Sequence, residues 1–78
     1  MKLPRNVSGA ALVSAFERVG YSLIRQRGSH MRMHHPGPPR HLITVPGHRP
    51  MRVGTLHALI TEVAQMRGLS VDEIIALL

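Results

Sequence analysis

The absence of cysteine in so short a chain is the feature that most limits its possible folds. The chain has 78 residues and no cysteine, so neither disulfide bonds nor thiolate metal sites can hold it together. A chain of this length buries a small share of its surface, and its core alone gives marginal stability. We therefore expect one small domain, residues 1–78, around a single apolar core, with a partner chain supplying some of the missing stability.

Apolar residues recur at helical spacing in two stretches. In the first, Ser8 is a candidate N-cap and Gly20 a stop signal. In the second, which follows the loop "PGHRPMRVG", we expect Thr55 to cap the helix and Gly68 to end it. The two apolar stripes are Leu12, Ala15, Phe16 and Val19, and Leu56, Leu59, Ile60 and Val63. Two amphipathic helices are therefore predicted.

A third, short helix is indicated near the end of the chain. The stretch "SVDE" is a capping box, in which the side chains of Ser70 and Glu73 each accept from the other's backbone amide. Leu69 and Ile74 stand where a hydrophobic staple would form.

Three stretches between the first two helices predict β-strands: "YSLIRQR", "HMRMHH" and "HLITV". The Gly28-Ser29 turn joins the first two strands, and the rigid loop "PGPPR" joins the second and third. Alternation in the second strand puts His30, Arg32 and His34 on one face and two methionines on the other. The order predicts an α+β fold, with helices on one face of a three-stranded antiparallel sheet.

The charges are unevenly distributed along the chain. Ten lysine and arginine residues oppose four acids, and between Arg18 and Thr61 the sequence has seven arginines, all six histidines and no acid. Such a field attracts polyanions, and the planar guanidinium donates two hydrogen bonds to one phosphate. An evenly solvated surface would normally mix both signs.

Other classes of protein fit the sequence poorly. No apolar run reaches membrane-spanning length, and the start lacks the apolar stretch of a signal peptide, so we expect a cytoplasmic protein. Phe16 and Tyr21 are the only aromatic residues, too few for a base-stacking platform. A zinc site could be built from the histidines around the hairpin, which are His34, His35, His41 and His48. However, cysteine and carboxylate ligands are absent nearby, and the arginines would repel a dication. We expect no metal and no cofactor.

Four blocks of the sequence together resemble the HicA family, the toxins of bacterial toxin–antitoxin pairs. They are "MKLPRNVSG", "GYSLIRQRGSHMRM", "ITVPGH" and "GTLHALITEVAQMRGLSVDEIIALL". Their order and spacing carry the resemblance, which covers nearly the whole chain. It implies a fold like that of a double-stranded-RNA-binding domain, cleavage of mRNA, and a HicB-like antitoxin as protein partner. The proline-rich and histidine-rich hairpin "HHPGPPRH" and the lack of lysine after Lys2 depart from the commonest pattern.

The resemblance assigns the catalytic histidine of the Gly-Ser-His block to His30. Imidazole titrates near neutral pH, so it can serve as a general acid or base in RNA cleavage. Alternation places this side chain on the polar face of its strand, beside an accessible turn. By residue type alone, however, an exposed histidine next to a turn also suits a purely structural role. His48 is the best candidate for a second acid or base, with His34 as a weaker one.

The candidate RNA-binding residues surround this block and precede the second long helix. They are Arg25, Arg27, Ser29, Arg32, Arg49 and Arg52. Three functions are compatible with this pattern: a metal-independent endoribonuclease toxin, a non-catalytic RNA-binding module, and a subunit that docks an acidic protein through its basic surface.

Overall fold

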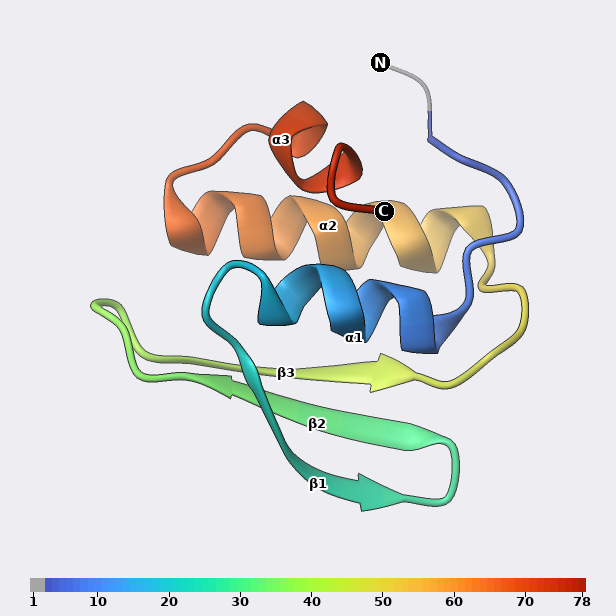
Figure 1. Ribbon diagram of the computed structural model, residues 1–78, viewed down its shortest axis with the longest axis horizontal. Coiled ribbons are helices and arrows are strands. Elements are labelled where there is room, and N and C mark those ends of the chain that lie inside the picture. Colours follow the sequence, from blue (N-terminus) through green and yellow to red (C-terminus); the bar gives the residue numbers. More distant parts are fainter. Residues whose placement is uncertain (1–2) are drawn as a thin grey trace.

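The computed structural model describes residues 3–78. Its elements are α1 (Gly9–Glu17), β1 (Ser22–Arg27), β2 (His30–His35), β3 (His41–Pro46), α2 (Val53–Arg67) and α3 (Val71–Ile75). The strands form one antiparallel sheet in the order β1-β2-β3, and the helices pack together on one side of it (Figure 1). The predicted α+β layout is confirmed.

Most of the helix boundaries follow from the local signals in the sequence. The Ser8 hydroxyl accepts a hydrogen bond from the Ala11 amide at 3.1 Å and so caps α1. Gly68 adopts the left-handed conformation, with φ of +67°, and ends α2. The Ser70–Glu73 capping box is complete, with both hydrogen bonds at 3.1 Å. None of the described helices has the length and apolar composition that a membrane crossing requires.

The predicted start of α2 is wrong. The helix begins at Val53 with Arg52 as its N-cap, and Thr55 lies inside its first turn. The reason is tertiary: Met51 is buried in the core, and its backbone amide donates to the Val7 carbonyl at 2.8 Å. This anchor fixes the chain just before the helix, so the backbone becomes helical three residues earlier than a cap at Thr55 would allow.

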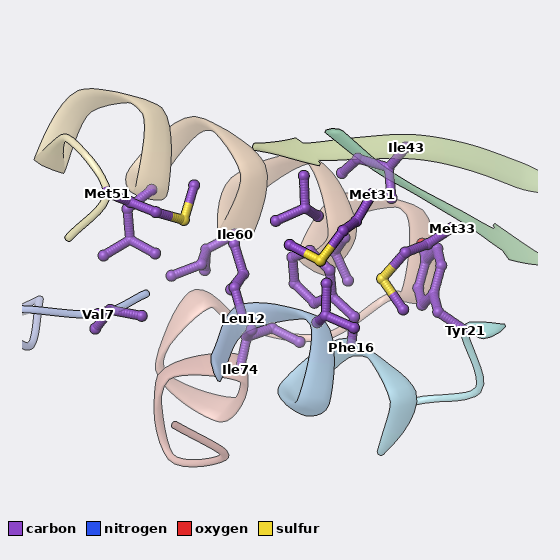
Figure 2. Packing of buried hydrophobic residues seen from close by; sticks show 14 of the residues in the cluster. Val7, Leu12, Phe16, Tyr21, Met31, Met33, Ile43, Met51, Ile60 and Ile74 are labelled. Atoms are coloured by element: carbon purple, nitrogen blue, oxygen red, sulfur yellow. The ribbon is translucent and has the colours of Figure 1, made fainter. Parts of the chain in front are cut away.

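The core lies between the inner face of the sheet and the helices (Figure 2). Met31 and Met33 of β2 and two residues of β3, Ile43 and Val45, point inward. They meet both predicted helix stripes, in which Phe16 is completely buried. Leu69 and Ile74 also pack against this cluster, as expected for a staple. The opposite face of β2, which carries His30, Arg32 and His34, is left for solvent.

Gly9 brings α1 unusually close to the end of β3. A Cβ atom at this position would lie 2.1 Å from the Pro46 carbonyl oxygen, so only glycine permits the approach. The Gly9 amide donates to the His48 carbonyl at 3.0 Å. This contact fixes the loop after β3 beside the start of α1, at the same end of the sheet as His30.

Candidate functional site

The β1–β2 hairpin determines where His30 lies. Gly28 takes a φ of +57°, which suits glycine, and the two-residue turn makes His30 the direct cross-strand partner of Arg27. Directly paired residues share a face of the sheet. The turn therefore places an arginine beside the histidine on the outer face, where both side chains are exposed.

The outer face of the sheet is hollowed around His30. The hollow has a volume of about 170 Å³, and its lining residues are Arg25, Arg27, His30, Arg32 and Thr44. We call it the arginine hollow. The strand register explains its composition, because Arg25 pairs with Arg32 and Arg32 pairs with Thr44 across the three strands. Four residues that sequence analysis singled out are thus brought together, three of them cationic.

Thr44 belongs to this site although sequence analysis did not select it. Its hydroxyl accepts a hydrogen bond from Nη1 of Arg32 at 2.8 Å. The bond holds the guanidinium across the outer face of β2 and β3. The alternation of "HLITV" contains the signal, since Thr44 stands between the two inward residues Ile43 and Val45. Only the register, however, assigns Arg32 as its partner.

The other candidate residues lie at the same end of the sheet but outside the lining of the hollow. Ser29 is in the hairpin turn, and its carbonyl accepts from the Gly47 amide. His48 follows at once, two residues after Pro46, which is the register partner of His30. Arg49 and Arg52 continue this exposed loop up to the start of α2. The loop thus extends the basic surface beyond the hollow.

A second cluster of polar side chains occupies the opposite end of the sheet. It consists of Tyr21, His35, His41, Glu62 and Arg67, and we call it the His35 cluster. The Tyr21 hydroxyl lies 2.6 Å from Nδ1 of His41, and Nε2 of His41 lies 2.7 Å from a Glu62 carboxylate oxygen. A carboxylate only accepts, so Nε2 of His41 donates to Glu62, while Nδ1 shares a hydrogen bond with the Tyr21 hydroxyl. The chain of bonds ties β3 to α2.

The surroundings of His35 fix the orientation of its ring and favour its neutral form. Its Nε2 donates to the Val19 carbonyl at 3.1 Å, while Nδ1 accepts from the Gly37 amide at 2.9 Å. Arg67 also contacts Nδ1, and its guanidinium lies 5.7 Å from the centre of the Tyr21 ring. Burial, followed by the positive charge of Arg67, lowers the pKa of His35. Burial likewise raises the pKa of Tyr21. Both groups therefore stay neutral at pH 7.

The remaining histidines differ from both groups. His34 shares the outer face with Arg32 but interacts with Arg40, whose Nε donates to it at 3.1 Å. His57 is exposed on α2. Within residues 3–78, no group of three or more histidine, aspartate or glutamate side chains has a geometry that could hold a metal ion. Glu62 does reach the histidine-containing segment, at His41, which sequence analysis did not foresee.

Comparison with known proteins gives one match. Residues 9–65, most of the chain, match the family described as "HicA toxin of bacterial toxin-antitoxin". Searches of curated proteins and of solved structures each returned no match. The matched range spans α1, the whole sheet and nearly all of α2, and so includes the arginine hollow and all of the His35 cluster except Arg67. The chain belongs to the HicA family of toxins from bacterial toxin–antitoxin systems.

Proposed function

We propose that this toxin is a metal-independent endoribonuclease that cleaves mRNA with His30 as its proton carrier. One observation carries the proposal: His30 lines a hollow together with three arginines. A histidine is able to take up and release protons near pH 7, and guanidinium groups bind phosphate in a bidentate manner. The arrangement thus supplies a proton carrier and an anion site within one cavity.

The proposed reaction uses the nucleophile that RNA itself carries. The 2′-oxygen attacks the adjacent phosphorus, and the bond from phosphorus to the 5′-oxygen breaks. A base takes the proton of the 2′-hydroxyl, an acid gives a proton to the departing 5′-oxygen, and the product ends in a 2′,3′-cyclic phosphate. His30 performs one of these transfers. Arg25, Arg27 and Arg32 stabilise the negative charge that develops on the phosphate oxygens.

His48 is our candidate for the second proton transfer. The support is its position in the exposed loop that follows Pro46, the register partner of His30. Ser29, Arg49 and Arg52 flank the hollow at this end and would bind neighbouring nucleotides. Arg52 immediately precedes α2, whose first amides are also suited to a phosphate. The antitoxin of the pair is proposed to be HicB-like and to silence the toxin by binding it.

The test compares His30→Ala with His57→Ala on a defined RNA. Both histidines are exposed, and only the first lines the hollow. We expect His30→Ala to lower the cleavage rate by about 10²–10⁴-fold while RNA binding persists, and His57→Ala to cleave like the wild type. Expression of the wild type should arrest growth, and expression of His30→Ala should not. Cleavage by His30→Ala within a few-fold of the wild type would refute the assignment.

One result would favour the alternative function. If the purified wild type binds RNA in a salt-dependent manner but never cleaves it, the basic face belongs to a non-catalytic RNA-binding module.

A further inference from the structure

The edge of the sheet at β1 is open. In the described part of the chain, β1 pairs with β2 alone and so presents one row of backbone N–H and C=O groups without strand partners. Edge strands of this kind readily accept a further strand. In Figure 1 the far end of β1, toward Arg27, lies away from all three helices. The helices therefore leave this end of the edge uncovered.

The side chains of β1 are as open as its backbone. All six residues, Ser22–Arg27, are exposed. Leu23 is 42% and Ile24 55% exposed, and they are two of the few large apolar side chains in residues 3–78 that solvent reaches to this extent. Ile24 is the extra residue of a bulge, without a register partner in β2. Adjacent exposed leucine and isoleucine side chains add nothing to phosphate binding, but they suit a protein contact.

The other edge of the sheet differs in each of these respects. All residues of β3 are buried or half-buried. The His41–Glu62 bond ties the start of this strand to α2, and its last residue, Pro46, has no amide hydrogen to donate. β1 is therefore the edge that is available to a partner.

The charges on β1 select the kind of partner. Arg25 and Arg27 stand on this strand, and the sequence has no acid between Arg18 and Thr61. Pairing with β1 of a second copy would bring these guanidiniums against one another, and like charges across a strand pair are destabilising. A strand with acidic side chains would instead meet both arginines with opposite charge.

We propose that the free edge of β1 binds an extended, acidic segment of the antitoxin, which adds a fourth strand to the sheet. Backbone hydrogen bonds give the pairing its affinity, and burial of Leu23 and Ile24 adds to it. Carboxylates of the added strand pair with Arg25 and Arg27, which also line the arginine hollow. The inference rests on the proposed function in one respect: these carboxylates then occupy the groups that would hold RNA phosphate, and cleavage stops.

The test uses Ile24→Glu, which puts a negative charge on the edge, outside the lining of the hollow, where it repels the carboxylates of an acidic strand. The matched control is Leu78→Glu, far from β1 in the sequence, where Leu78 lines another hollow with Leu3, Pro4, Arg5 and Ile75. The probe is the antitoxin that restores growth when co-expressed with this toxin, separated from the co-purified complex. We expect Ile24→Glu to weaken antitoxin binding by at least about ten-fold, and Leu78→Glu to leave it unchanged.

Hydrogen exchange of the wild-type complex gives a second readout that needs no variant. Amides of β1 that do not bond to β2 should become protected when antitoxin binds. Loss of antitoxin binding in Leu78→Glu alone, or protection confined to other elements, would overturn the proposal. A wild-type toxin that dimerises by itself and becomes monomeric on Ile24→Glu substitution would also overturn it. So would an Ile24→Glu variant that loses RNA affinity and still binds the antitoxin.

RNA cleavage by the free toxin separates this inference from the proposed function. If Ile24→Glu still cleaves RNA and no longer binds the antitoxin, both the proposed function and the docking site are supported. If wild-type toxin does not cleave RNA but its β1 edge is protected by antitoxin, only the proposed function fails. If the wild-type toxin cleaves RNA but β1 stays unprotected in the complex, only the proposal that β1 binds the antitoxin is refuted.

Discussion

The central strand carries a histidine at each end, and the two have opposite surroundings. His30 and His35 are five residues apart in β2, which corresponds to roughly 17 Å along a strand. His35 is half-buried, bonded through both ring nitrogens and in contact with Arg67. His30 is exposed in the arginine hollow. The two histidines of this strand thus have different surroundings. Those of His35 fix its ring in the fold, and those of His30 leave its ring accessible to an anionic ligand.

The difference lies in which groups surround each histidine ring. Around His35, burial and the nearby charge of Arg67 lower the pKa and so favour the neutral ring. Within residues 3–78, the one ion pair between a carboxylate and a histidine joins Glu62 to His41, at this end of the sheet. At the other end, His30 has arginines for neighbours and solvent access. A proton carrier for an anionic substrate needs that second kind of environment.

The largest expected effect concerns the substrate at the His30 end. RNA methylated at the 2′-oxygen, or DNA, lacks the nucleophile, so both should bind while cleavage falls below detection. EDTA should leave the rate unchanged, and the products should end in 2′,3′-cyclic phosphate or the 3′-phosphate it hydrolyses to. Electrophoresis of a defined oligonucleotide measures its cleavage with each substrate and in EDTA, and mass spectrometry identifies the ends of the products. Cleavage of DNA, or activity lost in EDTA and restored by magnesium, would contradict the mechanism.

The next effect separates stability from catalysis at the two ends. His35→Ala leaves the Val19 carbonyl and the Gly37 amide without their partner, which should lower the free energy of unfolding by about 1–3 kcal/mol. His30→Ala should change it by less than about 0.5 kcal/mol. Urea unfolding measures both, and RNA cleavage per folded molecule should stay near wild type in His35→Ala. Reversed results would exchange the roles of the two histidines.

A smaller effect is expected when the salt concentration is raised, which should weaken the binding of RNA. Three phosphates bound by the arginines of the hollow should reduce the affinity for single-stranded RNA roughly twenty-fold between 50 and 200 mM salt. The measurement uses His30→Ala to avoid cleavage. The slope of log affinity against log salt concentration should become less steep by about 0.7 when Arg32→Ala is added. Arg40→Ala, at the other end of β2 beside His34, is the matched control and should not alter it. An affinity independent of salt would rule out phosphate binding by the hollow.

The smallest effect is the pH dependence of stability. Because the pKa of His35 is lowered in the folded protein, the unfolded chain binds more protons below about pH 6.5. Stability should therefore fall as the pH is lowered through this value. Arg67, His34 and His41 also face this ring and disfavour its charged form. His35→Ala should give a shallower pH profile than the wild type in thermal unfolding between pH 7 and 5. Equal slopes for the two proteins would contradict the lowered pKa.

The sequence by itself determined the elements and their faces. Ser8, Gly68 and the Ser70–Glu73 box each act within one turn of the chain, so a local pattern suffices to find them. Alternation in β2 likewise separated Met31 and Met33 from the outer face, because side chains of a strand point to opposite sides. These local signals were enough to predict an α+β fold and an exposed His30.

Only the tertiary structure decided which side chains meet. Thr44 joins the hollow because of the strand register, and Glu62 reaches His41 because α2 packs over β3. Met51 fixes the start of α2 through a contact with Val7, more than forty residues earlier. Such contacts depend on how the helices cover the sheet, and no short stretch of sequence records that arrangement. In the same arrangement every residue of β3 is buried or half-buried, and every residue of β1 is exposed.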